Sequence, residues 1–188
     1  MRNSLAKIHW ASALACAAVL ALPGCKQAET ADTPSSQPSD KTLAASLAGT
    51  SDLSTVSGAL KDTGLSQVFD GAAPYTILAP TDSAFAKLGP AGADLRQPEQ
   101  RAALAALLRD HIVPGYLTPG DISQALDRAA GNAVKMKTMG GHLVTFSHAG
   151  KVLTVTQEDG SRADIAGDAV LAGNGVALPV DAVLKKLD

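Results

Sequence analysis

The stretch Tyr75–Leu88, YTILAPTDSAFAKL, contains a buried strand, the end of that strand and the start of a helix. Its first residues, Tyr75–Leu78, are β-favouring and mostly apolar, as in a strand at the centre of a sheet. Pro80 ends this run because proline has no backbone N–H to donate to a neighbouring strand. We therefore expect a short buried strand that stops at Pro80.

The second part of the stretch has the features of a helix N-terminus. Thr81 and Asp82 each carry a side-chain oxygen that can accept from the amides of a first turn, so either can be the N-cap. Phe85 and Leu88 are three residues apart and fall on one face of the helix. We expect this face and the preceding strand to share one core.

Apolar residues recur with helical spacing through the rest of the first half of the chain, and each run begins or ends at a capping residue. The residues that define these helices are Leu43 and Leu47; Leu53, Val56 and Leu60, ending at Gly64; Leu104, Leu107, Leu108 and Ile112 within Gln97–Ile112; and Ile122, Ala125 and Leu126 after a cap at Asp121.

After Asn132 the pattern changes to short β-rich runs separated by glycine turns, which predicts an antiparallel meander. The runs are Val134–Thr138, Leu143–Phe146, Val152–Val155, Arg162–Ile165, Ala169–Ala172 and Val176–Val180. Asn174-Gly175 is a strong hairpin signal between the last two runs. Early helices and late strands predict an α+β fold with antiparallel sheets, because a doubly wound sheet would alternate the two.

The composition limits the number of domains and the kinds of partner. A chain of 188 residues with 46% hydrophobic residues has enough apolar side chains for one sizeable core. Without residues 1–24 it keeps 14 basic and 18 acidic residues, a net charge of −4. No basic excess indicates a nucleic-acid partner, and the few aromatic residues do not suit stacking against bases.

The N-terminus has the pattern of an export signal. Arg2 and Lys7 precede Trp10–Leu22, an apolar run of signal-peptide length that is too short to cross a bilayer comfortably. The run closes in Leu22-Pro23-Gly24-Cys25, which resembles the lipobox of bacterial lipoproteins. We therefore interpret residues 1–24 as a lipoprotein signal peptide that is cleaved before Cys25.

The lipobox resemblance implies that Cys25 carries a diacylglycerol thioether and an N-linked acyl chain such as palmitate, and two or more chains give stable membrane anchoring. Cys16 would be lost with the signal, so no thiol would remain for a disulfide. The alternative is an ordinary secretory signal cut elsewhere, which leaves Cys25 as a free thiol.

Residues 25–40 are predicted to be the lipidated cysteine and a flexible tether. The segment Lys26–Asp40 is rich in Pro, Ser, Thr and Gln and has only alanine as apolar content, so it cannot offset the entropy of ordering by burial. Position 26, directly after the predicted lipidated cysteine, is Lys, whereas an Asp there would resemble an inner-membrane retention signal. These features predict a lipid-anchored domain, 41–188, in the cell envelope, at the outer membrane if the cell has one.

Three further segments resemble fasciclin domains over nearly the whole of 41–188. TILAPTDSAFAKL at Thr76–Leu88 resembles the first signature block, LLRDHIVPGYL at Leu107–Leu117 resembles the second, and DIAGDAVLAGNGVALPVDAVL at Asp164–Leu184 resembles the closing block. The chain departs from the family at Leu178-Pro179-Val180, which stands before Asp181 where the closing block commonly has a histidine.

The fasciclin resemblance implies a wedge-like β fold with helices packed against it, and an association with adhesion and surface interactions. It implies no catalytic centre and no cofactor. The residues that it marks as a structural or interaction motif are Thr81, Asp82, Phe85, His111, Asn174, Gly175 and Asp181.

The residues with reactive side chains fit structural roles better than chemical ones. His111 is expected to be a satisfied core histidine on the apolar face of its helix, and His142 and His148 could at most form a weak metal site. A third group, Asp164, Asp168 and Asp181, is expected to cap turns rather than to form a carboxylate site. No Gly-x-Ser-x-Gly or phosphate-loop pattern occurs in a suitable context.

The sequence therefore predicts a lipid-anchored interaction module that binds a protein or a surface polysaccharide, through loops or the helix that follows Thr81. The alternative is an envelope carrier or sensor of a small apolar ligand, which would need a large closed pocket. An enzyme would need acids, bases and a nucleophile that converge in one cleft.

Overall fold

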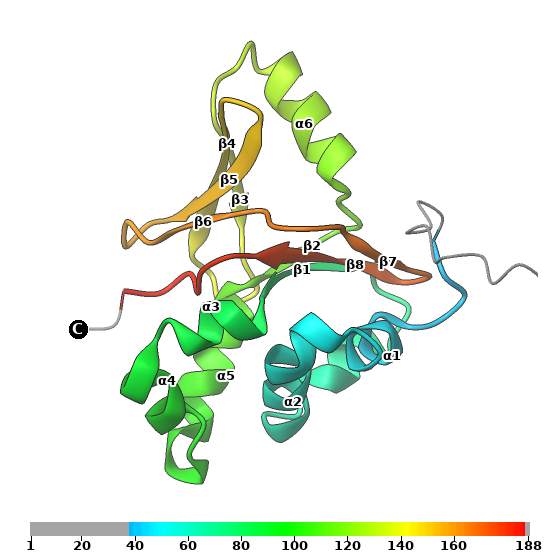
Figure 1. The fold of residues 1–188 in the computed structure, drawn as a ribbon. Coiled ribbons are helices and arrows are strands. Elements are labelled where there is room, and N and C mark those ends of the chain that lie inside the picture. Colours follow the sequence, from blue (N-terminus) through cyan, green and yellow to red (C-terminus); the bar gives the residue numbers. More distant parts are fainter. Residues whose placement is uncertain (1–37, 187–188) are drawn as a thin grey trace, which may run out of the picture. The chain divides into compact units, whose positions relative to one another are not determined.

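In residues 38–186, which the computed structural model describes, six of the eight strands follow the last helix. The helices of residues 43–110 gather on one side of the sheets (Figure 1). The predicted signal 1–24, Cys25 and most of the tether lie outside the described residues. Ser39, inside the predicted tether, donates its N–H to Leu171 O at 3.0 Å. Contacts with the sheet thus begin before Lys41.

The helices follow the predicted order, with one addition. They are α1 Leu43–Ala48, α2 Ser54–Asp62, α3 Asp82–Ala86, α4 Gly89–Leu95, α5 Arg101–Asp110 and α6 Pro119–Arg128. The apolar spacing does not predict α4, whose sequence GPAGADL contains two glycines and a proline. A Cβ on Gly92 would lie 2.8 Å from Leu88 Cβ, so this glycine lets α4 pack closely against the end of α3.

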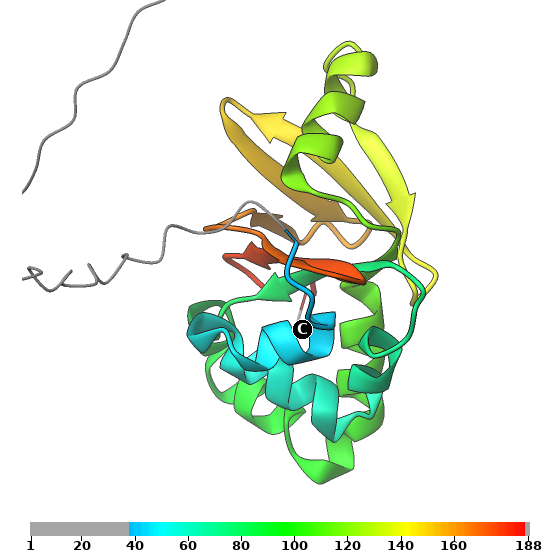
Figure 2. The same ribbon diagram turned by 90° about the vertical axis from the view of Figure 1, so that its right-hand side faces the viewer.

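The strands form two four-stranded sheets. Sheet A has the order β2-β1-β8-β7, and sheet B is the meander β3-β4-β5-β6 (Figures 1 and 2). The strands are β1 Tyr75–Pro80, β2 Ile112–Pro114, β3 Val134–Lys137, β4 Leu143–Ala149, β5 Val152–Gln157, β6 Arg162–Asp164, β7 Val170–Ala172 and β8 Gly175–Val180. The α+β prediction is confirmed, and sheet B is antiparallel throughout. Sheet A differs, because β1 and β8 are parallel.

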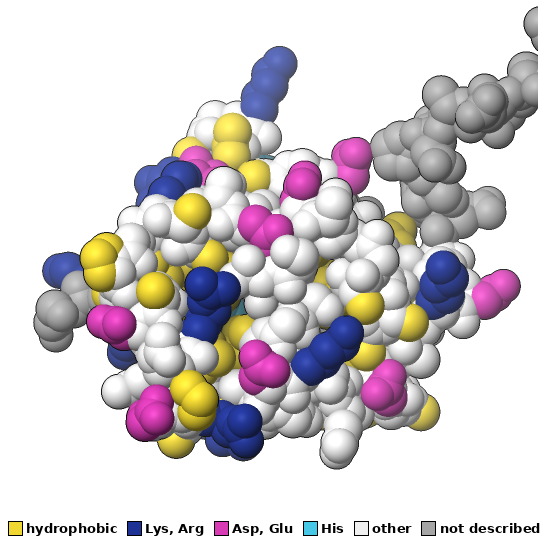
Figure 3. Space-filling view, turned by 60° about the horizontal axis from the view of Figure 1, so that its bottom comes forward, with side chains coloured by type: hydrophobic (Ala, Val, Ile, Leu, Met, Phe, Trp, Pro, Cys, Tyr) yellow, Lys and Arg dark blue, Asp and Glu magenta, His cyan; other side chains and the backbone are white. Residues whose placement is uncertain are grey.

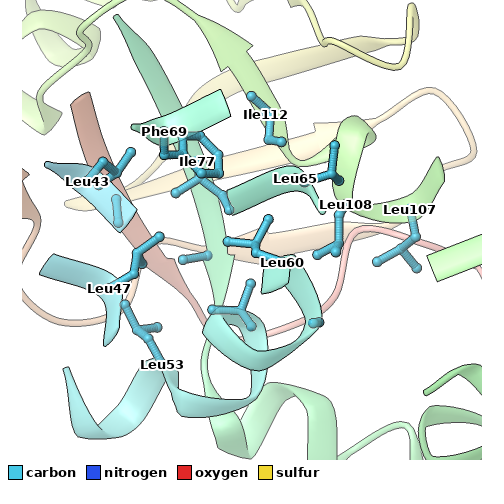
Figure 4. Close-up of a cluster of buried hydrophobic side chains, with 14 of the residues drawn as sticks. Leu43, Leu47, Leu53, Leu60, Leu65, Phe69, Ile77, Leu107, Leu108 and Ile112 are labelled. Carbon is cyan, nitrogen blue, oxygen red and sulfur yellow. The ribbon is translucent and has the colours of Figure 1, made fainter. Parts of the chain in front are cut away.

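Strand β1 separates two apolar cores because its side chains alternate between the faces of sheet A. Ile77 packs into the core beneath the sheet with Phe85 and with helices α1, α2 and α5 (Figure 4). Leu78 packs on the opposite face with sheet B and Leu126 of α6. The expectation that the strand and the helix of the Tyr75–Leu88 stretch share a core is confirmed by Ile77 and Phe85.

Three local predictions need correction. The helix predicted over Gln97–Ile112 is α5, which begins at Arg101 after a 3₁₀ turn and ends at Asp110, while Ile112 begins strand β2. Thr118, not Asp121, is the N-cap of α6; Asp121 is the third helical residue and completes a capping box with Thr118. In each case the predicted helix is present, but it begins or ends at a different residue from the one predicted.

The third correction concerns the last hairpin. Ala172 pairs with Gly175, so the two loop residues are Gly173 and Asn174 rather than Asn174 and Gly175. Gly175 is the first residue of β8. A Cβ at this position would lie 2.5 Å from Tyr75 O and 2.8 Å from Leu43 Cδ2, so Gly175 is required by close packing rather than by a turn.

Candidate interaction surface

Thr81 and Asp82 cap two different helices. Thr81 is the N-cap of α3, and its Oγ1 accepts from Ala84 N at 3.1 Å. Asp82 reaches the start of α2, where Oδ1 accepts from Thr55 N and Oδ2 accepts from Ser54 Oγ, both at 2.7 Å. Partial burial raises the pKa of Asp82, but the hydrogen bonds from Ser54 and Thr55 outweigh it and hold the pKa below its ordinary value.

A surface hollow of about 210 Å³ adjoins this junction. Asp82, the buried residue Phe85 and Arg96, which follows α4, are among the residues that line it. Arg96 also lines a neighbouring hollow of about 210 Å³ together with Arg101. We call these two concave sites, with Asp82, Phe85, Arg96 and Arg101, the helix-face hollows.

The helix face carries mixed charge. Figure 3 shows this side of the molecule, with Lys and Arg side chains interspersed among Asp and Glu and with small hydrophobic areas between them. Such a surface gives no strong field of one sign, so it favours recognition by shape and local hydrogen bonds. Arg96 was not among the residues singled out from the sequence, since no motif marks it.

Asn174 connects three segments at the other end of sheet A. Its Oδ1 accepts from Leu43 N at 2.7 Å, and its Nδ2 lies 2.7 Å from the carbonyl oxygens of both Phe69 and Gly71. A hollow of about 390 Å³ opens beside it, lined in part by Lys41 and Asp70. Asn174 therefore holds α1 and the 3₁₀ turn before β1 onto the β7–β8 hairpin.

His111 is fully buried, as expected, although it follows the last residue of α5 rather than lying within the helix. Its Nδ1 lies 2.9 Å from Leu107 O, and its Nε2 lies 3.0 Å from Leu184 N. A backbone N–H can only donate, so Nε2 is the acceptor and Nδ1–H donates to Leu107 O. Burial lowers the pKa of His111, and the Leu107 carbonyl and Asp110 oppose this shift.

Asp181 joins the end of β8 to two neighbours. Its Oδ1 accepts from Asp164 N at 2.8 Å, and its backbone oxygen accepts from Lys87 Nζ at 2.7 Å. Asp164 in turn accepts from Thr154 Oγ1 at 2.7 Å. These two aspartates make loop and strand-end hydrogen bonds, as predicted from their positions, and their carboxyl groups bind separate partners.

The sequence did not predict that one pair of titratable residues, Asp110 and His142, lies in contact. Nδ1 of His142 lies 2.7 Å from Oδ1 of Asp110, which joins the end of α5 to the β3–β4 turn. The hydrogen bond to Asp110 and the charge of Asp110 raise the pKa of His142. The two residues are 32 positions apart, and no local pattern in the sequence connects them.

The candidate residues do not converge on one chemical centre. Asp82 and Phe85 lie at the helix-face hollows, Asn174 lies beside a separate hollow, and His111 is inside the core. Within residues 38–186, no group of three or more His, Cys, Asp or Glu side chains could hold a metal ion. In the same residues, no helix combines the length and the apolar character needed to span a bilayer.

The model of the Fasciclin domain matches residues 51–186. The chain belongs to the fasciclin family. Fasciclin domains are non-catalytic binding modules.

Two curated relatives and one solved structure illustrate the family. The chain is 31% identical over 140 residues to Protein sll1483 of Synechocystis, with 73% of this chain and 69% of that protein covered. It is 29% identical to transforming growth factor-beta-induced protein ig-h3 of Sus scrofa, covering 74% of this chain but 18% of that protein. A FAS1 domain pair from the insect cell adhesion molecule Fasciclin I shares the fold, with TM-score 0.57, 22% identity, and coverage of 71% of this chain and 45% of that one.

Proposed function

We propose that this protein is a lipid-anchored adhesion or interaction module of the cell envelope, which binds a protein or a surface polysaccharide through its fasciclin domain. The match over residues 51–186 carries this proposal, because it assigns most of the chain to a family of binding modules. Cys25 after the signal-like segment would supply the lipid anchor, at the outer membrane in a cell that has one.

The helix-face hollows are the surface that we assign to the partner. Binding residues usually lie in loops and element ends that a rigid scaffold positions, and here α3 is fixed by Thr81 and by the Asp82 bonds to α2. Arg96 and Arg101 offer guanidinium groups that can bind the carboxylate, hydroxyl or backbone oxygens of a partner.

The alternative of an apolar-ligand carrier gains no support from these hollows. Charged residues line both of them, and each holds only about 210 Å³, below the usual range for a pocket that encloses a small ligand.

Site-specific photo-crosslinking in intact cells tests the proposed surface. A photo-reactive residue at Ala93, which lines the first hollow, is expected to give a discrete crosslinked species. The matched control is Val152, an exposed apolar residue at the start of β5 on sheet B. Crosslinks from Val152 alone would move the binding surface to sheet B, and no crosslink from either position would contradict the proposed role.

A further inference from the structure

Strand β7 is the last strand of sheet A, and among the strands of residues 38–186 it pairs in that sheet with β8 alone. Its other side is the open edge of the sheet. The N–H and C=O groups of successive residues in a strand point alternately to its two sides. Leu171 O accepts from Ser39 N at 3.0 Å, so the backbone groups of Leu171 face away from β8 and toward this open edge.

The chain before α1 already pairs with this edge. Ser39 forms a parallel bridge with Ala172, and Gly173 N donates to Lys41 O at 3.0 Å. Figure 2 shows this blue segment passing from β7 toward α1. The hydroxyl groups of Ser39 and Ser46 lie 3.4 Å apart, so the side chain of Ser39 faces α1. Ser39 thus makes an isolated parallel bridge to the edge of sheet A at the end of β7.

A groove of about 460 Å³ continues along the same edge. One wall is α1 and its end, where Ala45, Ser46 and Gly49 leave room because their side chains are small. Asp168–Leu171 also line the groove. Leu171 N–H lies on the same side of β7 as Leu171 O, and the same alternation, extended to the residue before β7, would direct Ala169 C=O to that side.

The β7 edge lacks the usual protection of an exposed strand edge. Strand β3, at the edge of sheet B, carries the exposed residues Lys135 and Lys137, whose charges discourage pairing with another chain. Strand β7 has the sequence VLA and carries no charge or proline. An open, apolar strand edge beside a groove is suited to accept one more extended segment.

We propose that the residues just before Ser39, Pro34–Pro38, occupy this groove and extend the parallel bridge into a strand. Gln37 N–H would donate to Ala169 O, and Gln37 O would accept from Leu171 N–H. This segment precedes or borders the described residues, and it enters at the mouth of the groove because Ser39 is already fixed there. Its attachment to the domain gives it a high effective concentration at the edge, compared with any free peptide.

The spacing of the prolines fits this arrangement. In a parallel strand, the backbone N–H and C=O groups of residues 35, 37 and 39 would point toward β7. Those of residues 34, 36 and 38 would point away from the sheet. Pro34 and Pro38 therefore both fall on the outward side, where a missing N–H costs no ladder bond. Proline at an outer edge also blocks further strand addition. The segment would close the sheet and shorten the spacer between Cys25 and the domain to residues 26–33.

Hydrogen exchange tests this proposal through the alternation of the strand. The full chain is compared with Gln37→Pro and Ser36→Pro, which place the same residue at adjacent positions. Gln37→Pro removes the N–H that would pair with Ala169 O and is expected to speed exchange at the Leu171 amide about tenfold. Ser36→Pro is expected to leave that rate unchanged, because Ser36 N–H would face outward. Fast exchange at Leu171 in the unmodified chain, or equal effects of both variants, would overturn the proposal.

Photo-crosslinking gives a second measurement. The side chain at position 37 would lie on the same strand face as Ser39, so a photo-reactive residue there is expected to crosslink within the chain to residues 45–50. The same group at position 36 would face the other way and give no such product. Crosslinks from position 37 to a second molecule would show that another occupant fills the groove, and would refute the assignment to this segment. The proposed adhesion function would stand in that case, because it rests on the helix-face hollows.

Discussion

The Nε2 atom of His111 lies 3.0 Å from the backbone nitrogen of Leu184 and accepts a hydrogen bond from that N–H. The folded state therefore holds the neutral ring, and burial lowers the pKa of His111 from its ordinary value of 6.5. Below pH 6.5 the unfolded chain takes up a proton that the folded chain resists. The stabilisation from His111 is full above that pH and falls by up to about 1.4 kcal/mol per pH unit below it.

Urea unfolding at pH 7.5 and pH 5.5 measures this dependence. His111→Gln keeps an acceptor near Leu184 N–H but cannot titrate, so it is expected to lose part of the acid sensitivity while remaining folded. Asp110, which precedes His111, opposes the lowering of its pKa and is unchanged in this variant. An acid sensitivity identical to that of the unmodified protein would show that other groups cause it.

The Asp110–His142 pair is expected to respond to pH in the opposite direction. The hydrogen bond and charge of Asp110 raise the pKa of His142 above 6.5, so its stabilisation is present below that pH and is lost as the pH rises through the folded pKa. A proton NMR titration should show a lower midpoint for His142 in Asp110→Asn. Glu158→Gln, which removes only a weaker charge effect, should lower the midpoint less. Equal shifts in the two variants would contradict the pairing.

Gly175→Ala is expected to destabilise the fold by about 2 kcal/mol, because the added methyl group would press on Tyr75 O and Leu43 Cδ2. Gly58→Ala is the matched control. Gly58 lies within α2 with nothing within 4 Å of an added Cβ, so alanine there should stabilise by about 0.8 kcal/mol. Chemical denaturation measures the change in the free energy of unfolding for each variant, which is expected to be a loss for Gly175→Ala and a gain for Gly58→Ala. No change for Gly175→Ala would mean that β1 and β8 are not this close.

Asp82→Ala is expected to cost about 1–2 kcal/mol, because two donors at the start of α2 lose their acceptor. Asp82→Asn should cost less, since its amide oxygen can still accept from Thr55 N–H. The lowered pKa of Asp82 adds an acid dependence, with stabilisation present above pH 3.8 and lost as the pH falls below it. Thermal unfolding at pH 7 and pH 3 compares the variants, and an Asn variant as acid-sensitive as the parent would exclude this carboxyl as the cause.

Processing at Cys25 would remove Trp10, the only tryptophan of the chain. The protein purified from cell membranes is therefore expected to show no tryptophan emission under selective excitation, and to incorporate labelled palmitate. Cys25→Ala should abolish the label, while Cys16→Ala, within the predicted signal, should not. A tryptophan band in the labelled protein would mean that the cleavage site is elsewhere.

Local sequence patterns predicted several elements well. Helical spacing marks α1, α2 and most of α5, and glycine turns between β-rich runs mark the meander of sheet B. Thr81 and Asp82 were identified as alternative caps after Pro80, and Thr81 is the N-cap of α3. These features are decided within a few residues, where side-chain spacing and backbone preference act directly.

Long-range pairing was not predictable in the same way. The parallel register of β1 with β8 aligns Tyr75 with Gly175, and no local signal distinguishes it from an antiparallel arrangement. The second partner of His111, the Asp110–His142 pair and the three bonds of Asn174 likewise join segments far apart in the chain.

By itself, then, the sequence determined the α+β class, the approximate helices and the meander, since each depends on spacing between near neighbours. Only the tertiary structure decided that Asp82 caps α2, that Gly175 must lack a side chain, and that β7 has an open edge beside a groove. The physical reason is that these relationships depend on which surfaces meet when the chain closes, and contacts between distant residues carry no fixed period in the sequence.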